Sequence, residues 1–297
     1  MPGGRGRGGP MPREVQVSKA LSKLLRHSAE KEGLQLDAAG YINLKDVLNN
    51  QRIRGLKATL AEVKQIVAEN DKQRFSLIHK SAAASTTSSV PADDAATSTT
   101  SDIPSQFPES DDPADYLIRA NQGHSLEIAS ENLLTPITEE NLPPTVVHGT
   151  THAAWPLIVA TGGLKKMTRT HVHFASGLPA GFKSEDKDAN VAPVISGMRN
   201  SSSVLVYIDI EKAMEAGIKF WKSENGVILS EGDENGIISL QFFSKAEDRT
   251  GGQGVLVENG TVLQETPESW TKPKKVNKPR KQQDVTKDQA DQKSTST

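Results

Sequence analysis

Residues 81–113 form a stretch rich in Ser, Thr, Ala, Asp and Pro that contains no Lys or Arg and almost no large apolar side chain. Such a segment cannot bury enough apolar surface to offset the entropy lost on ordering, so we predict that it is disordered. The tails 1–12, rich in Gly and Arg, and 266–297, rich in Lys, Gln, Asp and Pro, are predicted to be disordered as well. The ordered parts of the chain are then two blocks, at about 13–80 and 114–265.

The composition excludes several classes of protein. There is no cysteine, so disulfide scaffolds, thiolate nucleophiles and cysteine-ligated zinc are ruled out. The longest run of large apolar residues, 204–208, is far too short for a membrane helix, and the N-terminus does not resemble a signal peptide. We therefore expect a soluble intracellular protein of the cytoplasm, the nucleus or both, with no membrane partner.

The first block is basic, with a net charge of +5 over residues 13–80. Its first helix carries an apolar stripe at helical spacing, with basic groups off the stripe. The stripe is Val17, Leu21, Leu24 and Leu25, and the basic groups are Lys19, Lys23, Arg26 and His27. Further helices at about 45–50 and 56–69, and strands near 41–44, 74–78 and 116–119, predict a winged-helix-like lobe. The 81–113 insert would lie at the tip of its hairpin, where a long loop costs only about 2 kcal/mol more than a short one.

The second block carries a net charge of −7 over residues 114–266 and alternates short strands with two short helices. We expect strands at 146–148, 168–174, 203–210, 219–221, 227–229 and 237–243, in a mixed but mostly antiparallel sheet. The fold class is therefore α+β. No G-x-G-x-x-G, Walker A or G-x-S-x-G sequence occurs, so dinucleotide-fold, P-loop and α/β-hydrolase chemistry have no support.

Two polar clusters are candidate anion sites. Arg26-His27 ends the first helix, where it is either a solvated helix end or, with Lys23, a bracket for a phosphate. The run Arg119-Ala120-Asn121-Gln122-Gly123-His124-Ser125 closes a strand and is either a polar turn or a reader of phosphate and sugar.

The strand at 168–174 places Arg169, His171 and His173 on one face. An H-x-H strand can bind zinc, but no carboxylate is suitably spaced, so we expect no metal. The alternatives are a solvated face and a face that meets an anionic ligand. Nearby, His148-Gly149-Thr150 ends a strand with two hydrogen-bonding side chains around a glycine that permits close approach to a ligand.

Six segments occur together in one order: LSKLLRH (21–27), IRANQGHS (118–125), VVHGT (146–150), MTRTHVHF (167–174), VYIDI (206–210) and GIKFWKSENGVILSEG (217–232). In this combination the chain resembles the tRNA 2′-phosphotransferase family. The resemblance implies a winged-helix-like RNA lobe, placed at 13–125, and an ADP-ribosyltransferase-like NAD lobe, placed at 126–265. The inserts at 81–113 and 181–193 depart from the family pattern and are expected to be extra loops.

The resemblance also implies roles for individual residues. The catalytic set would be Arg26, His27, Arg119 and Arg169. NAD+ would be held by His148, Gly149, Thr150 and His173, with His171 as the alternative to His173. RNA would be contacted by Lys23, Asn121, Gln122, His124 and Ser125. The third position of the ADP-ribosyltransferase triad, a glutamate in protein-modifying relatives, would fall in the apolar segment 226–229.

The activity implied is transfer of the splice-junction 2′-phosphate of tRNA to NAD+. It gives 2′-OH RNA, nicotinamide and ADP-ribose 1″,2″-cyclic phosphate, through an RNA 2′-phospho-ADP-ribose intermediate. The expected partners are 2′-phosphorylated tRNA and NAD+, and the expected oligomeric state is a monomer. The alternatives are an NAD-dependent ADP-ribosyltransferase that modifies protein or nucleic-acid ends, and a non-catalytic RNA-binding adaptor.

Overall fold

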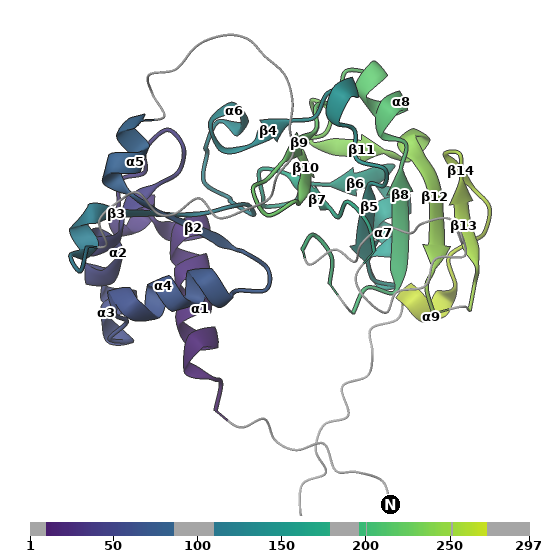
Figure 1. The fold of residues 1–297 in the computed structure, drawn as a ribbon. Helices are drawn as coiled ribbons and strands as arrows, with labels where there is room; N and C mark the ends of the chain where they lie inside the picture. The colour runs from purple at the N-terminus through teal and green to yellow at the C-terminus, as the bar shows by residue number, and fades with distance from the viewer. Residues whose placement is uncertain (1–9, 86–109, 179–195, 200, 251, 272–297) are drawn as a thin grey trace, which may run out of the picture.

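The computed structural model describes residues 10–85, 110–178, 196–199, 201–250 and 252–271 (Figure 1). Most of the expected insert, of the expected tails and of the polar 181–193 segment lies outside these ranges. The boundaries expected for the insert, 81–113, and for the C-terminal tail, 266–297, are wrong where they include residues that the structure describes as helical. Residues 80–85 form helix α5 (Lys80–Ser85), and α9 (Glu268–Thr271) lies within the expected tail.

Residues 13–69 are mainly helical, and their apolar side chains build one hydrophobic cluster. The predicted stripe of the first helix is buried in this cluster. Asparagine and threonine side chains cap the later helices, and Thr59 forms a capping box with Glu62. The elements are α1 (Arg13–Lys23), the π-helical turn η1 (Leu24–Ser28), η2 (Glu30–Glu32), α2 (Leu44–Asn49), α3 (Gln51–Gly55), which the sequence did not predict, and α4 (Leu60–Glu69).

A three-stranded antiparallel sheet packs against these helices in the order β1-β3-β2. Its strands are β1 (Ile42–Asn43), β2 (Phe75–His79) and β3 (Tyr116–Ala120), and the 3-10 turn η3 (Pro113–Asp115) leads into β3. The pairing of β2 with β3 runs from Phe75–Ala120 to His79–Tyr116. The predicted hairpin is therefore confirmed, and β3 extends from the helices toward the remaining sheets (Figure 1).

The rest of the described chain is mostly short strands, and every strand pair in it is antiparallel. The strands are β4 (Thr135–Pro136), β5 (Val147–Thr150), β6 (Gly163–Lys165), β7 (Val172–Phe174), β8 (Val204–Ile208), β9 (Trp221–Lys222), β10 (Ile228–Ser230), β11 (Ile237–Ser239), β12 (Phe243–Asp248), β13 (Val255–Glu258) and β14 (Thr261–Val262). The helical pieces are α6 (Ser130–Leu133), η4 (Glu139–Asn141), α7 (Trp155–Ala160), α8 (Ile210–Glu215) and η5 (Leu240–Phe242).

These strands form several sheets instead of the single mixed sheet expected. Their orders are β14-β13-β12-β8-β5, β4-β9-β10-β7 and β11-β6. A bridge between Val147 and Ala175 joins the first sheet to the end of β7. A second large hydrophobic cluster, with Trp155, Phe174 and Phe243 fully buried, lies between the sheets and helices. The fold is thus α+β, as predicted. Each of the two large hydrophobic clusters packs against its own antiparallel strands.

Two predicted strands differ from the structure. The strand expected at 168–174 is only β7, because residues 168–171 form turns and bends. The strand expected at 237–243 is divided into β11, η5 and β12.

No described helix is long and apolar enough to cross a membrane. Among the described residues, no three His, Asp or Glu side chains are grouped so that they could hold a metal ion.

Candidate active site

Arg26 and His27 lie in η1, the π-helical turn that continues α1. Single π-turns inside a helix shift the side chains that follow, and they are frequent at functional sites. The Nδ1 of His27 lies 3.0 Å from the hydroxyl of Ser125, and the Ser125 amide donates to the carbonyl of Arg26 at 3.0 Å. These contacts join the end of the first helix to the loop after β3.

Arg119, near the end of β3, is held by groups from the helical part and from the loop between β9 and β10. Its Nη1 donates to the carbonyl of Ala39 at 3.1 Å, and its Nη2 pairs with Glu224 at 3.2 Å. Its guanidinium also lies over the ring of Tyr41, 4.5 Å from the centroid. Only 13% of the Arg119 side chain is exposed, so its orientation is fixed without a ligand.

The loop after β3 brings the first helix and β7 to one point. Gly123 has φ of +86°, in the left-handed region that favours glycine. A Cβ at this position would lie 3.5 Å from Nη1 of Arg26 and 3.6 Å from Nε2 of His173. The guanidinium and the imidazole therefore converge over Gly123. An alanine there would be strained by its backbone conformation, while its Cβ would make ordinary van der Waals contact with both groups.

The other polar residues of this loop divide into two groups. Asn121 and His124 are buried, while Gln122 is half-buried and Ser125 is exposed. The Asn121 amide accepts from Ser76 at 2.5 Å and donates to the carbonyl of Gln73 at 2.9 Å. Its hydrogen bonds thus fix the loop against β2.

The two histidines around β7 face different surroundings. His173 donates through Nδ1 to the carbonyl of His171 at 3.0 Å, which leaves Nε2 toward Gly123. His171 instead lies 2.9 Å from the Ser130 hydroxyl and 3.5 Å from Glu231. Only His173 of this pair is therefore beside Arg26. Arg169 is exposed on the turn before β7.

The His148-Gly149-Thr150 segment forms the end of β5. The Nδ1 of His148 lies 2.8 Å from the carbonyl of His173, so β5 and β7 are joined at this level. Thr150 is buried. A Cβ on Gly149 would meet Met198 and Ser202 at less than 3.0 Å, so only glycine fits under these side chains.

Burial and crowding of cations dominate the electrostatics of the cluster. Burial, followed by the charges of Arg74 and Arg169, lowers the pKa of Arg26 to about 10, so it stays protonated at neutral pH. Burial and then Arg26 lower the pKa of His124 to about 3, and burial and then Arg169 lower that of His173 to about 3. Burial and then Arg26 also lower the pKa of His27 below its usual range.

Unsatisfied polar atoms concentrate in this same cluster. In the described part of the chain, six buried side-chain nitrogen or oxygen atoms have no hydrogen-bond partner. Five of them belong to it: Nε and Nη2 of Arg26, Nε of Arg119, and Nε2 of His124 and of His173. Native proteins leave few buried polar groups unpaired, so these atoms indicate a place built for an outside partner. Three of the five are guanidinium donors, which suit an anion.

Three further residues near the cluster were not predicted from the sequence. Glu224 accepts from Ser76 at 2.6 Å and from Arg119. These contacts join the β1-β3-β2 sheet to the loop between β9 and β10. Arg74 lowers the pKa of Arg26, and Arg199 that of Arg169. Glu224 lies in the 217–232 segment, but nothing in the sequence places it against Arg119. Arg74 and Arg199 come from segments without any motif.

Comparison with known proteins places these residues in a family. The sequence profile described as "RNA 2'-phosphotransferase, Tpt1 / KptA family" matches residues 12–232. The chain belongs to this family.

Curated relatives agree with the RNA 2′-phosphotransferase family. The protein named tRNA 2'-phosphotransferase 1 of Danio rerio is 38% identical over 245 residues, which is 82% of this chain and 90% of that protein. The Homo sapiens protein of the same name is 37% identical over 249 residues, 82% of this chain and 81% of its own. The tRNA 2'-phosphotransferase of Saccharomyces cerevisiae is 35% identical over 222 residues, which is 73% of this chain and 79% of that protein. Every predicted site residue lies inside the family match, whereas β11 to β14 and α9 lie beyond it.

Proposed function

We propose that this RNA 2′-phosphotransferase acts on tRNA that carries a splice-junction 2′-phosphate and transfers that phosphate to NAD+. The observation that carries the proposal is the set of five unpartnered buried nitrogens on Arg26, Arg119, His124 and His173. A dianionic phosphate beside the NAD+ diphosphate would satisfy the guanidinium donors among them. In this proposal the helices with the β1-β3-β2 sheet are the winged-helix-like RNA lobe, and the later sheets are the ADP-ribosyltransferase-like NAD lobe.

The residues at the ends of β5 and β7 are the proposed contacts to NAD+. Thr150 and the backbone of Gly149 would hold the nicotinamide and its ribose, with His148 and His173 beside them. His173 is preferred to His171, because its Nε2 lies next to Arg26 while His171 is bonded to Ser130. NAD+ is a co-substrate here and supplies the ribose carbon that accepts the phosphate.

In the first step, a 2′-phosphate oxygen of the RNA attacks C1″ of the nicotinamide ribose, and the C1″–N bond breaks to release neutral nicotinamide. The phosphate is already anionic at neutral pH, so little proton transfer is needed. This step depends chiefly on alignment of the two substrates. Arg119 suits that task, because its contacts with Ala39, Glu224 and Tyr41 fix its direction in advance.

In the second step, the ribose 2″-hydroxyl attacks the phosphorus and releases its proton to water, the bond to the RNA 2′-oxygen breaks, and that oxygen takes up a proton. Arg26, Arg119 and Arg169 would stabilise the charge that develops on the phosphoryl oxygens. His27 would supply the proton. Its pKa is lowered in the free protein, but a bound phosphate brings negative charge beside it and raises the pKa again.

The same geometry disfavours a transferase that stops after the first step. Protein-modifying enzymes of this kind would need a carboxylate at the third triad position. Val227, Ile228 and Leu229, which occupy the corresponding segment, are fully buried and apolar.

The test is an assay of the full chain with NAD+ and an RNA that carries one internal 2′-phosphate. We expect 2′-OH RNA, nicotinamide and ADP-ribose 1″,2″-cyclic phosphate in equal amounts. Release of nicotinamide with stable ADP-ribosylated RNA as the final product would contradict the proposal. Absence of any NAD+ consumption would contradict it as well.

A further inference from the structure

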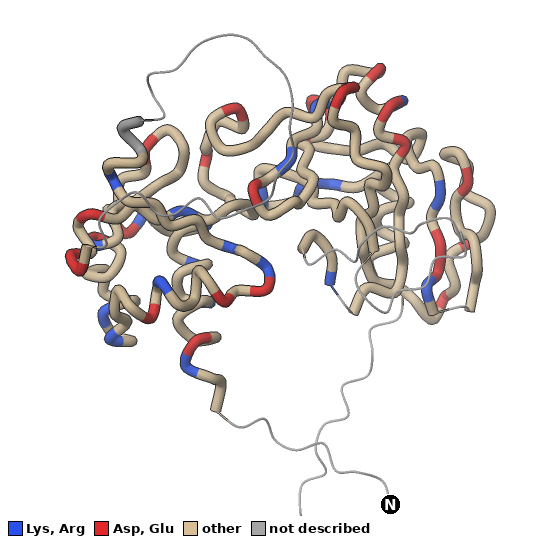
Figure 2. Tube along the Cα trace, viewed as in Figure 1, with Lys and Arg blue, Asp and Glu red and all other residues tan. Residues whose placement is uncertain are grey.

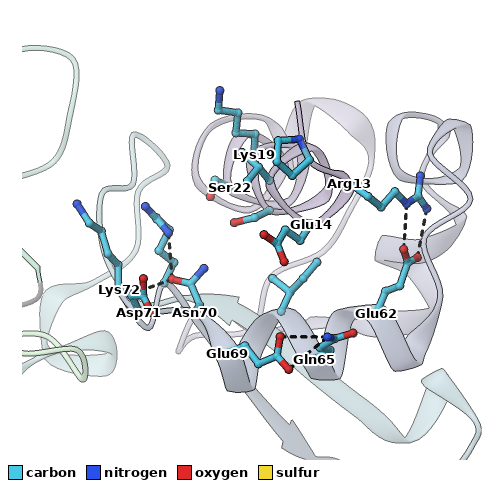
Figure 3. Close-up of a pocket in the computed structure, with 15 residues that line it drawn as sticks. Arg13, Glu14, Lys19, Ser22, Glu62, Gln65, Glu69, Asn70, Asp71 and Lys72 are labelled. Carbon is cyan, nitrogen blue, oxygen red and sulfur yellow. Dashed lines mark hydrogen bonds and ion pairs between the residues drawn. The ribbon is translucent and has the colours of Figure 1, made fainter. Parts of the chain in front are cut away.

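A groove of about 780 Å³ lies between α1, α4 and the turn that joins α4 to β2 (Figure 3). This volume is in the range of pockets that hold one ligand of nucleotide size. Twelve of the fifteen residues that line it are polar or charged, and they include four cationic and four carboxylate side chains. None of these residues belongs to the predicted active-site set.

Charges of both signs line the groove, and Asp71 lies beside Lys72 at the end where most of the cations gather (Figure 3). At one end Arg13 is paired with Glu62 through two contacts, at 2.9 and 3.2 Å (Figure 3). At the other end Lys19 comes from α1, and Lys72 and Arg74 come from the turn. In the described part of the chain, neither the Lys19 nor the Lys72 ammonium forms an ion pair. The carboxylates of Glu14 and Glu69 lie between the two ends (Figure 3).

The basic end of the groove adjoins the active-site cluster. The backbone amide of Asn121, in the loop after β3, donates to the carbonyl of Arg74 at 3.0 Å, so the turn that lines the groove contacts the loop that carries the cluster. On α1, Lys19 and Lys23 are one turn apart, and Arg26 follows one turn later, so cations continue from the groove to the cluster. The turn is fixed in place, because Ser196 and Asn225 both donate to the carbonyl of Lys72, at 3.2 and 2.9 Å.

We propose that this groove binds the RNA nucleotide adjacent to the 2′-phosphorylated one, with Lys19, Lys72 and Arg74 on its backbone phosphate. The inference rests on the proposed function, because it takes the phosphate at Arg26 to be part of an RNA. A single-stranded nucleotide explains both kinds of charge. The backbone phosphate meets the cations, while carboxylate and amide groups of Glu14, Gln65 and Glu69 accept from the amino groups of a base. A phosphate ion alone leaves the carboxylates unexplained.

The test compares two substrates with the same 2′-phosphate: a single nucleotide, which has no neighbour to place in the groove, and an oligonucleotide extended on both sides. The variant is Lys19→Ala with Lys72→Ala, because neither residue has been placed at the reacting phosphate. We expect KM for the oligonucleotide to rise about tenfold with kcat unchanged, and KM for the single nucleotide to change less than twofold. Loss of one backbone phosphate contact should also reduce the slope of log KM against log salt by about 0.7 for the oligonucleotide.

The matched control is Lys31→Ala with Lys45→Ala, which removes the same charge from exposed positions of the same helical part outside the groove. It should behave as the wild type on both substrates. Equal KM changes for the single nucleotide and the oligonucleotide, or none for either, would overturn the inference. Fluorescence anisotropy with the labelled oligonucleotide measures the same loss of affinity without turnover. A groove that fails to bind RNA can therefore be told apart from a protein that lacks the proposed activity.

Discussion

At the scale of single residues, the site depends on cations that stay charged and on histidines that stay neutral. Arg26 keeps its proton at neutral pH although its pKa falls to about 10. His124 and His173 are uncharged at any pH above about 3. The neutral histidines do not add to the repulsion between Arg26, Arg74 and Arg169. In the proposed mechanism, charge for the phosphate thus comes from guanidinium groups, and His27 is the imidazole that exchanges a proton.

Replacement of Arg26 or His27 by alanine should slow the second chemical step more than the first. The first step needs alignment only, whereas the second needs charge stabilisation and a proton for the leaving oxygen. Loss of one such contact costs on the order of 10²–10³-fold in rate. Rapid quenching and gel analysis should therefore show RNA 2′-phospho-ADP-ribose accumulating in Arg26→Ala and His27→Ala. Inactive variants that never show this species would mean that the two residues only bind substrate.

Acid should destabilise the free protein through His124 and His173. Their pKa values are depressed on folding, so the unfolded chain binds protons below about pH 6.5 that the folded protein refuses. The free energy of unfolding is therefore highest above pH 6.5. Below pH 6.5 each of the two histidines lowers it by about 1.4 kcal/mol per pH unit. Urea unfolding from pH 7.5 to 5 should show this slope. His124→Gln and His173→Gln should each remove the part of this slope that the replaced histidine contributes. An unchanged slope would contradict the assignment.

At the scale of elements, patterns within one segment were predictable, and contacts between distant segments were not. The stripe from Val17 to Leu25 predicted α1 and its buried face, because a helical period is local. The π-turn at Arg26 was not predictable, since tertiary contacts such as Ser125 to the Arg26 carbonyl hold it. For the same reason the sequence singled out Arg119 but not Glu224, which lies 105 positions away and pairs with it.

The short helix α9 was assigned to a disordered tail, because its composition is polar apart from Trp270. In the structure the Trp270 ring stacks on His152, with centroids 4.0 Å apart and planes at 12°. His152 in turn lies 2.9 Å from Asp248, which is buried and also accepts from three backbone amides of its own loop. One aromatic contact therefore connects α9 to the residue that follows His148-Gly149-Thr150 by two positions.

Trp270→Ala should lower the free energy of unfolding by about 1–3 kcal/mol, from lost stacking and lost burial against the second cluster. Trp270→Phe keeps a ring over His152 and should recover at least half of the loss. A double-mutant cycle with His152→Ala should give a coupling of about 0.5–1.5 kcal/mol. Additive effects in chemical denaturation would show that Trp270 does not act through His152.

At the scale of the whole molecule, two hydrophobic clusters are connected by polar contacts between distant parts of the chain. Ser76 and Arg119 bond Glu224, and Lys72 bonds Asn225, so the helical part is attached to the later sheets beside the active-site cluster. Positive and negative side chains are interspersed over both parts (Figure 2), including the α4–β2 turn between them. In the proposed function, the local arginines, and not the net charge of either part, provide the attraction for RNA.

Replacement of residues 86–109 by four Gly or Asn residues should preserve kcat/KM. The change keeps α5 and the contacts of Ser110 and Asp112 that precede β3. It shortens the connection between His79 and Tyr116 from 36 to 16 residues, which lowers the closure cost by only about 0.7 kcal/mol. Thermal unfolding and steady-state assays test both statements. A loss of activity greater than about threefold would show that the segment takes part in substrate binding.

The crowding of guanidinium groups around Arg26 has a practical consequence for handling the protein. An anion that binds there relieves the mutual repulsion of the arginines, and it stabilises the folded state by about 2.7 kcal/mol at a concentration 100 times its Kd. Inorganic phosphate, pyrophosphate and ADP-ribose all have suitable charge. Each would occupy the position of the RNA phosphate or of the diphosphate beside it. A buffer screen ranked by melting temperature will therefore place the strongest inhibitors first, and the conditions best for storage will be the poorest for assay.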